Sequence, residues 1–418
     1  MNALTIDGGV PLSGTFFIGG AKNAALPACV ASLLTDDPVT LHAVPQLRDV
    51  STILYTLGAL GKRVVRHDDN VSIASGERLI SEANAYSVRQ MRASFLVLGP
   101  LVARLGKAVV PLPGGCAIGA RPVDLHLDGL RALGARVEER GGVVVVTAAR
   151  LRGATIDLPF PSVGATEQLV MAASLADGVT ALRNAAVEPE VGDLIELLRT
   201  MGAHIEVHGR DVRVEGRRSL SGSEHVLIPD RMEAGTFLMA GAITGGHVRV
   251  APVRPGQMCQ VLDTLEAVGC RIVREEDAIE MDAREPLRGV HVETAPYPGF
   301  PTDLHPQLAA LLCRADGTST IRETVFERRF AYTAGLSRMG ASMVQDGPTL
   351  RIEGGRTLRG ERVEAPDIRG GAALVLAGLA AQGRTVVTGL DHIDRGHDDL
   401  AGKLAKAGAR IERRDDET

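Results

Sequence analysis

The stretch LRALGARV, residues 130–137, decides the fold because similar stretches recur along the whole chain. In each copy a leucine-rich helix end is followed by a glycine, one or two small or polar residues, and a strand start. A glycine there can end a helix in the left-handed conformation without steric cost. The glycines lie 73, 68, 67, 71 and 68 residues apart. They are Gly61, Gly134, Gly202, Gly269, Gly340 and Gly408.

Each repeated unit also holds an earlier helix that is hydrophobic on almost every side, which predicts burial rather than a surface position. Examples of these helices are expected over residues 23–34, 91–105, 166–176, 233–243 and 371–381. The unit therefore reads as strand, buried helix, strand, amphipathic helix and hairpin, and predicts an α/β fold. Solenoid repeats usually have about 20 to 50 residues, so these longer units are more typical of small subdomains. Six subdomains packed as three and three would form two lobes, and ligands commonly bind in the cleft between lobes.

Composition excludes several classes of protein. The chain has 418 residues, a net charge of −5 and 3% aromatic residues, which argues against nucleic-acid binding. No apolar run is long enough to span a bilayer, and the first residues lack the features of a secretory signal. Five scattered cysteines form neither a metal-binding spacing nor an even disulfide framework. We therefore expect a cytoplasmic protein that binds neither nucleic acid nor membrane.

Basic residues stand where the buried helices are expected to begin. Gly19, Gly20 and Lys22 precede the first of them, and glycines before a helix can present backbone N–H groups to an anion. Ordinary capping would explain the polar residues at the other helix starts, but cations are disfavoured there by the helix dipole. Capping would account for Ser162, Thr166, Asp303 and Asp367; it would not account for Arg92, Arg231 and Arg369. A multiply anionic ligand would suit these helix starts.

Residues 112–122, LPGGCAIGARP, contain three glycines and two prolines, so they predict a mobile loop. The loop carries Cys116, and the nearby Arg121 would favour its thiolate form. Cysteines more often serve as small buried apolar residues, which is what we expect of Cys29 and Cys313. Cys116 is therefore the candidate reactive thiol.

Several motifs together resemble one family, the UDP-N-acetylglucosamine enolpyruvyl transferases. The resemblance is carried by GAKNAALP at 20–27, MRAS at 91–94, PGGCAIGARPVDLH at 113–126 and FPTD at 300–303. Further matches lie at 162–166, 188–190, 323–327 and 392–396. They follow the family order along nearly the whole chain and leave only the acidic tail after Arg414.

The resemblance implies an inside-out α/β barrel with two lobes of three repeats each. One lobe would contain residues 22–230 and the other residues 1–21 and 231–418, with the active site in the cleft between them. The implied reaction transfers the enolpyruvyl group of phosphoenolpyruvate to the 3-hydroxyl of UDP-N-acetylglucosamine and releases phosphate, the first committed step of peptidoglycan precursor synthesis. It needs no metal or organic cofactor, and no obligate protein partner is evident.

The resemblance also implies roles for individual residues. Cys116 would protonate the methylene carbon and form a covalent adduct, and Asp303 would accept the proton of the sugar hydroxyl. The residues implied to hold phosphoenolpyruvate are Lys22, Asn23, Arg92, Arg121, Arg369 and Arg395. Those implied to contact UDP-N-acetylglucosamine are Asn23, Arg92, Arg121, Pro122, Val123, Asp124, Leu125, Ser162, Val163, Gly164, Asp303 and Val325. Lys22 and Arg395 would also assist catalysis.

Some positions depart from the family pattern. Phe160 stands where a lysine is frequent, which puts one diphosphate or uracil contact in doubt. Gly370 and Gly371 replace bulkier residues, and residues 327–329 contain an extra basic residue. These departures leave open a paralogue that acts on a related nucleotide sugar. Two further alternatives are the sister enzyme 5-enolpyruvylshikimate-3-phosphate synthase and an inactive regulator that binds a nucleotide sugar.

Overall fold

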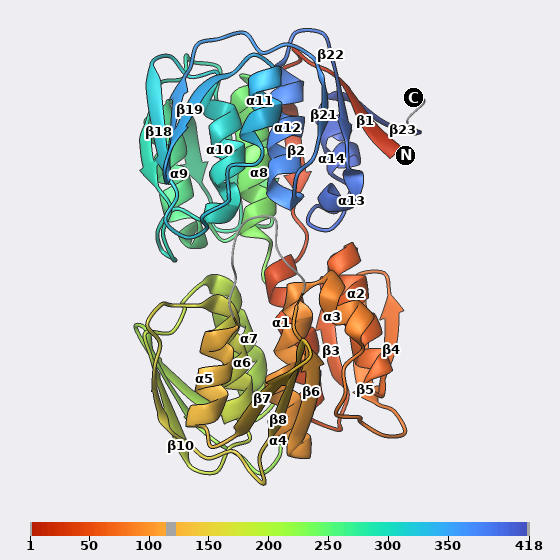
Figure 1. Ribbon diagram of the computed structural model, residues 1–418. Coiled ribbons are helices and arrows are strands. Elements are labelled where there is room, and N and C mark those ends of the chain that lie inside the picture. Colours follow the sequence, from red (N-terminus) through yellow and green to blue (C-terminus); the bar gives the residue numbers. More distant parts are fainter. Residues whose placement is uncertain (1, 114–122, 416–418) are drawn as a thin grey trace. The chain divides into compact units, whose positions relative to one another are not determined.

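The computed structural model describes residues 2–113 and 123–415, which divide into two compact units (Figure 1). The central unit runs from Gly20 to Ile228. The terminal unit contains the residues up to Gly19 and those from Pro229 onward, and so holds both ends of the described chain. Each unit has a hydrophobic core of its own, around three buried helical segments. Both units mix helices and sheets, as the α/β prediction requires.

The central unit has three sheets, and its buried helices are α1 (Lys22–Ala31), α4 (Leu98–Leu105) and α6 (Val163–Ala173). The first sheet contains β13 (Ser223–Val226), β3 (Val39–His42), β5 (Asn70–Ser75) and β4 (Lys62–His67). The second contains β6 (Lys107–Pro111), β8 (Val143–Thr147) and β7 (Arg136–Arg140). The third contains β11 (His204–His208), β12 (Asp211–Glu215), β10 (Val179–Arg183) and β9 (Thr155–Asp157). The other helical segments are η1 (Ser32–Leu34), α2 (Arg48–Ala59), α3 (Ala85–Gln90), η2 (Arg92–Val97), α5 (Asp124–Ala132) and α7 (Pro189–Thr200).

The terminal unit also has three sheets, and its buried helices are α8 (Arg231–Ile243), α10 (His305–Leu312) and α12 (Ile368–Ala380). One sheet contains β15 (Arg271–Arg274), β16 (Ile279–Asp282), β14 (His247–Ala251) and β2 (Ser13–Phe17). Another contains β17 (His291–Glu293), β18 (Thr318–Arg322), β20 (Thr349–Glu353) and β19 (Ser342–Asp346). The last contains β21 (Arg362–Glu364), β22 (Arg384–Thr388), β1 (Asn2–Asp7) and β23 (Arg410–Asp415). The remaining segments are η3 (Pro255–Gln257), α9 (Cys259–Val268), η4 (Thr302–Leu304), α11 (Thr333–Arg338), α13 (Leu390–Ile393) and α14 (Leu400–Lys406).

One strand order recurs among these sheets. A parallel pair is extended by an antiparallel strand, which in turn forms an antiparallel ladder with the last strand, as in β17-β18-β20-β19. The sheet β6-β8-β7 lacks the first strand, and a single parallel bridge between Glu82 and Val109 stands at that edge. All six repeated glycines have positive φ, from 86° at Gly134 to 114° at Gly269. The predicted helix ends are confirmed.

The first two strands of the chain pair with segments that are distant in sequence. β2 precedes α1 but pairs with β14, whereas β13 precedes α8 but pairs with β3. β1 lies between β22 and β23, so it completes the sixth sheet. The strand after Gly408 differs from those after the other repeated glycines, because the partner of β23 comes from the other end of the chain. Local pattern cannot reveal a partner at that separation.

The expected buried helices exist, with shifted boundaries. All 13 residues of α8 and all eight of α10 are buried. The segment expected at 91–105 begins as the 3₁₀ turn η2 and becomes α-helical only at Leu98. Pro100 then falls in the first turn of α4, where its missing N–H is tolerated.

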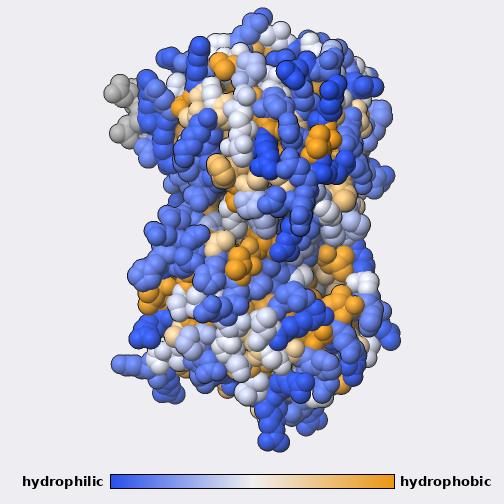
Figure 2. All heavy atoms as spheres, turned by 180° about the vertical axis from the view of Figure 1, so that it is seen from behind, coloured by the Kyte–Doolittle hydropathy of each residue, from blue (hydrophilic) through white to orange (hydrophobic). Residues whose placement is uncertain are grey.

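Polar side chains cover most of the surface in Figure 2, and the hydrophobic residues on this face form small scattered groups. Large apolar residues with high exposure, such as Phe17, Tyr86 and Val344, lie far apart in the sequence. None of the helices among residues 2–113 and 123–415 has the length and apolar character needed to cross a membrane.

Candidate active site

Charged side chains lie at the N-termini of several helices in the terminal unit. Asp230 caps α8, accepting from the N–H groups of Met232 and Glu233 at 2.8 and 3.1 Å. Asp367 caps α12, accepting from the N–H groups of Arg369 and Gly370 at 2.9 and 3.0 Å. The capping expected of Asp367 is confirmed.

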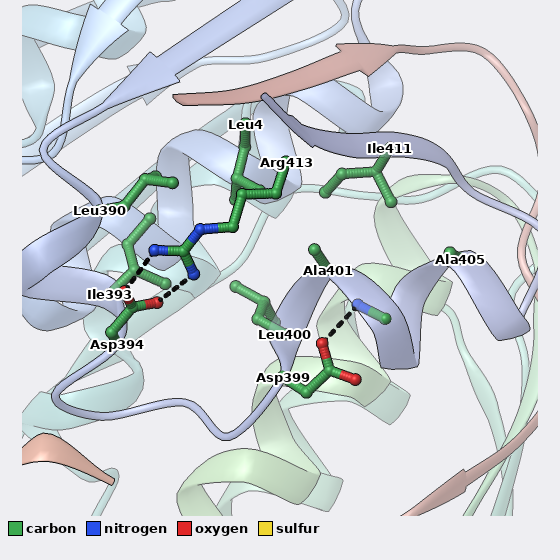
Figure 3. A pocket seen from close by; sticks show the side chains of 11 residues that line it. Leu4, Leu390, Ile393, Asp394, Asp399, Leu400, Ala401, Ala405, Ile411 and Arg413 are labelled. Carbon is green, nitrogen blue, oxygen red and sulfur yellow. Dashed lines mark hydrogen bonds and ion pairs between the residues drawn. The ribbon is translucent and has the colours of Figure 1, made fainter. Parts of the chain in front are cut away.

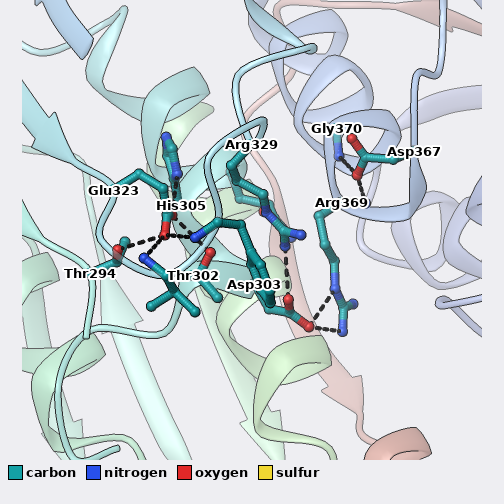
Figure 4. Close-up of polar contacts among 12 residues, drawn as sticks. Thr294, Thr302, Asp303, His305, Glu323, Arg329, Asp367, Arg369 and Gly370 are labelled. Carbon is teal, nitrogen blue, oxygen red and sulfur yellow. Dashed lines mark hydrogen bonds and ion pairs between the residues drawn. The ribbon is translucent and has the colours of Figure 1, made fainter. Parts of the chain in front are cut away.

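Asp303 lies in η4, just before α10, but caps no helix. Its carboxylate instead lies between two buried guanidinium groups (Figure 4). Oδ2 accepts from Nε and Nη2 of Arg369 at 3.2 and 3.0 Å, and Oδ1 accepts from Nη2 of Arg329 at 2.8 Å. The capping explanation was wrong for Asp303, because two cations hold its oxygens. It was also wrong for Thr166, whose hydroxyl accepts from the N–H of Ala186 at 3.0 Å.

Carboxylates from the starts of three helical segments act on Arg369, so these helix starts lie close together. Burial alone would lower the pKa of Arg369, but nearby carboxylates, Asp303 foremost, raise it above its ordinary value. Asp230 and Asp367 contribute to the same rise. Arg369 therefore remains a cation although only 5% of its side chain is exposed.

Two N–H groups of these guanidiniums are buried without a hydrogen-bond partner among the residues described: Nη1 of Arg369 and Nε of Arg329. Buried donors in native proteins are nearly always satisfied, so such an atom points to an unseen acceptor. Nη1 of Arg369 lies 3.8 Å from the position that a Cβ would take at Gly396, the neighbour of Arg395. The structure thus brings Asp303, Arg369 and the segment of Arg395 together.

A buried hydrogen-bond network lies beside Asp303 (Figure 4). Oε2 of Glu323 accepts from His305 Nδ1 at 2.9 Å and from the Thr302 hydroxyl at 2.8 Å. Oε1 accepts from the N–H groups of Val325 and Phe326 at 2.7 and 3.0 Å. Burial raises the pKa of Glu323, but these bonds, that of His305 first, lower it to about 2. Val325, a predicted sugar contact, is thereby held in a defined turn.

The segment that carries Arg395 is anchored on both sides. Before Arg395 in the chain, the carboxylate of Asp394 accepts from Nη1 and Nη2 of Arg413 of β23 at 3.1 and 2.7 Å (Figure 3). After Arg395, Asp399 accepts from the N–H of Gly402 at 3.0 Å. Between them is a cavity of about 290 Å³. It is lined by Leu4, Leu390, Ile393, Asp394, Asp399, Leu400, Ala401, Gly402, Ala405, Ile411 and Arg413.

The glycines after Arg369 permit close helix packing. A Cβ at Gly371 would lie 2.7 Å from Ile393 Cγ1, and one at Gly370 would lie 2.8 Å from Pro366 Cγ. Larger residues at these positions would therefore displace α13 or the residues before α12, and Arg395 is the second residue after α13.

In the central unit, Lys22 begins α1 and is 7% exposed. Its ammonium group lies 3.0 Å from Oδ2 of Asp49, which is in the first turn of α2 and is also buried. Removing either partner of such a buried pair would be destabilising. Asn23 follows on α1 and is partly exposed.

Other predicted residues of the central unit gather around His126 of α5. Nδ1 of His126 lies 3.1 Å from Oε1 of Gln168, and a Cβ at Gly164 would lie 3.2 Å from the imidazole ring. Burial lowers the pKa of His126 to about 4, and the charge of Arg92 contributes to the decrease. Ser162 caps α6, accepting from the N–H of Ala165 at 3.4 Å. Val163 begins α6, Val123 precedes α5, and Asp124 and Leu125 begin α5.

Cys116, Arg121 and Pro122 lie outside the described residues. Three of the other cysteines, Cys29, Cys270 and Cys313, are buried, and burial raises the pKa of each thiol to about 12. Cys259 is exposed. Among residues 2–113 and 123–415, no group of three or more His, Cys, Asp and Glu side chains could hold a metal ion.

Sequence reasoning missed four residues at these sites. Asp49 resembles any acidic residue in a helix first turn, and His126 resembles any residue of an amphipathic helix. Arg329 was noted only as part of a segment with an extra basic residue, residues 327–329, and Glu323 only as part of a motif. Their partners lie between 18 and 42 residues away for the pairs Glu323–His305, Asp303–Arg329, Lys22–Asp49 and His126–Gln168. Spacing alone gave no signal for these contacts.

Comparison with known proteins shows which family the chain is similar to. Residues 6–404 match the sequence model of the EPSP synthase (3-phosphoshikimate 1-carboxyvinyltransferase) family. UDP-N-acetylglucosamine 1-carboxyvinyltransferase of Granulibacter bethesdensis is 48% identical over 417 residues, and form 2 of Carboxydothermus hydrogenoformans is 47% identical over 416 residues. Each alignment covers 99% of both chains.

Solved structures agree with this assignment. The enolpyruvyl transferase NikO from Streptomyces tendae has a TM-score of 0.91 at 27% identity, covering 99% of this chain and 98% of its own. The EPSP synthase of Acinetobacter baumannii shares the fold, with a TM-score of 0.79 at 19% identity over 99% of this chain and 100% of its own. The chain therefore belongs to the EPSP synthase family, within its group of UDP-N-acetylglucosamine 1-carboxyvinyltransferases.

Proposed function

We propose that this protein transfers the enolpyruvyl group of phosphoenolpyruvate to the 3-hydroxyl of UDP-N-acetylglucosamine, the first step of peptidoglycan precursor synthesis. The observation that carries the proposal is Nη1 of Arg369, which has no hydrogen-bond partner among the described residues, lies beside Gly396 and belongs to the guanidinium that holds Asp303. One cation thus contacts a candidate base and offers a donor to an anion. Phosphoenolpyruvate carries a carboxylate and a phosphate that such a donor could bind.

The proposed reaction has two stages. In the addition, the sugar oxygen bonds to C2 of phosphoenolpyruvate, C3 gains a proton, and the hydroxyl loses its own proton to Asp303. In the elimination, C3 loses a proton and the bond between C2 and the phosphate oxygen breaks, which releases phosphate and leaves the enolpyruvyl ether. Cys116 is the proposed acid toward C3 and the residue that forms the covalent adduct.

The cations have an electrostatic role in this proposal. Negative charge moves from the enol to the departing phosphate, and preorganised cations stabilise charge where it develops. Lys22, Arg121 and Arg395 are the proposed phosphate and carboxylate ligands, and Arg92 and Arg369 assist them. Lys22 is already fixed by its pair with Asp49, so little reorganisation is needed when the substrate arrives.

The nucleotide sugar is proposed to bind through two sets of residues. Asn23, Asp303 and Val325 would contact the amino sugar. The uridine diphosphate would lie against Arg92, residues 121–125 and residues 162–164, several of which surround His126 in this structure.

We further propose the architecture expected for this family: an inside-out α/β barrel of six βαβαββ repeats, with residues 22–230 as one lobe and residues 1–21 and 231–418 as the other. The recurring strand order and the helices buried on all sides support it. The cytoplasm is the proposed location, and no obligate protein partner is proposed.

A substrate panel tests the function. Phosphoenolpyruvate is supplied with UDP-N-acetylglucosamine, its galactosamine epimer or shikimate 3-phosphate, and phosphate release is measured. Release only with UDP-N-acetylglucosamine supports the proposal. A preference for the epimer would indicate a paralogue, release with shikimate 3-phosphate the sister enzyme, and no release in any mixture an inactive binding protein.

A further inference from the structure

We propose that His305 is a positioning residue, which fixes the segments that carry Asp303 and Val325 through its bonds to Glu323 and Tyr332. The inference rests on the proposed function and adds residues to which neither the motifs nor the comparisons give a role. Its basis is a chain of short hydrogen bonds around the buried side chains of His305, Glu323 and Tyr332, and Figure 4 shows the contacts of Glu323.

His305 is the first residue of α10, two positions after Asp303, and its side chain is 0% exposed. Its Nδ1 lies 2.9 Å from Oε2 of Glu323, and its Nε2 lies 2.7 Å from the hydroxyl of Tyr332. A carboxylate only accepts, so Nδ1 carries the proton and Nε2 accepts from Tyr332. Burial lowers the pKa of His305, which favours this neutral form.

Glu323 connects His305 to two other segments by hydrogen bonds. Its Oε2 also accepts from Thr302, the residue before Asp303, and its Oε1 holds the backbone of Val325 and Phe326. Oε1 accepts from the hydroxyl of Thr294 as well, at 2.9 Å. One carboxylate therefore joins the approach to the candidate base with the turn that is proposed to contact the sugar.

Tyr332 extends the network to a third segment. It is fully buried, and it lies three residues after Arg329, which holds Oδ1 of Asp303. The rings of His305 and Tyr332 also meet edge to face, with centroids 5.5 Å apart. His305 thus ties residues 302–305, 323–326 and 329–332 together, and each of these segments either carries Asp303 or Val325 or contacts Asp303.

Three variants test the inference. His305→Gln keeps a donor toward Glu323 and an acceptor toward Tyr332, whereas His305→Leu keeps the bulk and removes both. Val248→Ala opens the buried core of a different sheet in the same unit and is the control for lost stability. The measurements are kcat and KM for UDP-N-acetylglucosamine, and hydrogen exchange at the amides of Val325 and Phe326.

We expect His305→Leu to lower kcat/KM about 10²-fold, the loss typical of misplacing a reacting group by about 1 Å. Exchange at both amides should accelerate. His305→Gln should remain close to the parent in both measurements, and Val248→Ala should change neither. If His305→Leu retains kcat and KM with unchanged exchange, or if Val248→Ala shows the same losses, the positioning role is wrong.

Two further points keep the test decisive. Should His305→Leu fail to fold, Tyr332→Phe removes only the hydroxyl, and it should still accelerate exchange at Val325 and Phe326; unchanged exchange would overturn the inference. Should the parent protein show no turnover, the proposed function fails, but exchange in the variants still decides whether His305 fixes the turn.

Discussion

Replacing Asp303 with asparagine should damage turnover and stability by separate mechanisms. The asparagine keeps the shape of the side chain but cannot take the proton of the sugar hydroxyl. We expect turnover at saturating substrates to fall by about 10²–10⁴-fold, the usual contribution of a general base. Phosphate release measures this loss directly. Turnover near the parent value would refute the role of Asp303 as the base.

The cost in stability follows from the geometry. The substitution removes the negative charge between Arg369 and Arg329, whose side chains are 5% and 3% exposed. Breaking a buried ion pair by removing one partner typically costs about 3–5 kcal/mol. Because 28% of the Asp303 side chain is exposed, solvent offsets part of this, and we expect about 3 kcal/mol from urea unfolding.

A double-mutant cycle separates the two effects. Arg329→Met removes one of the two cations, so Asp303→Asn should cost less in that background than in the parent, by about 1–3 kcal/mol. Strict additivity would show that the ion pair is not formed in solution. Glu327→Gln is the matched control, since it changes an exposed carboxylate close by in sequence and should alter neither turnover nor stability.

Three other outcomes are expected. Lys22→Met should lower the free energy of unfolding by about 3–5 kcal/mol because it breaks the buried ion pair with Asp49; adding Asp49→Leu should restore stability in urea unfolding but not phosphate release. His126 has a pKa near 4 when folded and about 6.5 when unfolded, so stability should fall by up to about 3 kcal/mol as the pH drops from 6.5 to 4. Urea midpoints across this range should fall less steeply for His126→Gln; an equal slope would exclude His126 as the cause. Iodoacetamide should label the exposed Cys259 but none of the three buried cysteines, whereas an epoxide phosphonate shaped like phosphoenolpyruvate should select Cys116, as peptide mass spectrometry can determine. Adducts of the epoxide elsewhere would contradict the role proposed for Cys116.

The repeat was predictable because its signals are local. A glycine that ends a helix and a helix that is apolar on every side are both visible within about 15 residues, and all six glycines have the predicted positive φ. The exchange of β2 and β13 was not predictable from such signals. Both strands have ordinary strand composition, and only the assembled sheets show which partner each one takes.

The candidate site likewise contains residues that could be predicted from local signals and residues that could not. Arg92 and Arg369 were noticed because cations are unusual at helix N-termini, and Lys22 because it follows two glycines before a helix. Arg329 and His305 could not be assigned, because their importance lies in contacts with Asp303, Glu323 and Tyr332 that no spacing rule encodes. Asp303 itself was interpreted in two ways, as a helix cap and as a base, and the geometry excludes only the first.

The central claim is enolpyruvyl transfer by addition and elimination, and one reaction in isotopic water tests it most directly. The protein is mixed with phosphoenolpyruvate and UDP-N-acetylglucosamine in D₂O containing ¹⁸O, and the products are analysed by mass spectrometry. The account predicts an enolpyruvyl ether with deuterium on its methylene carbon, because C3 passes through a methyl group. It also predicts phosphate free of ¹⁸O, because the C–O bond of phosphoenolpyruvate is the one that breaks. Phosphate labelled with ¹⁸O, or an ether without deuterium, would contradict the mechanism.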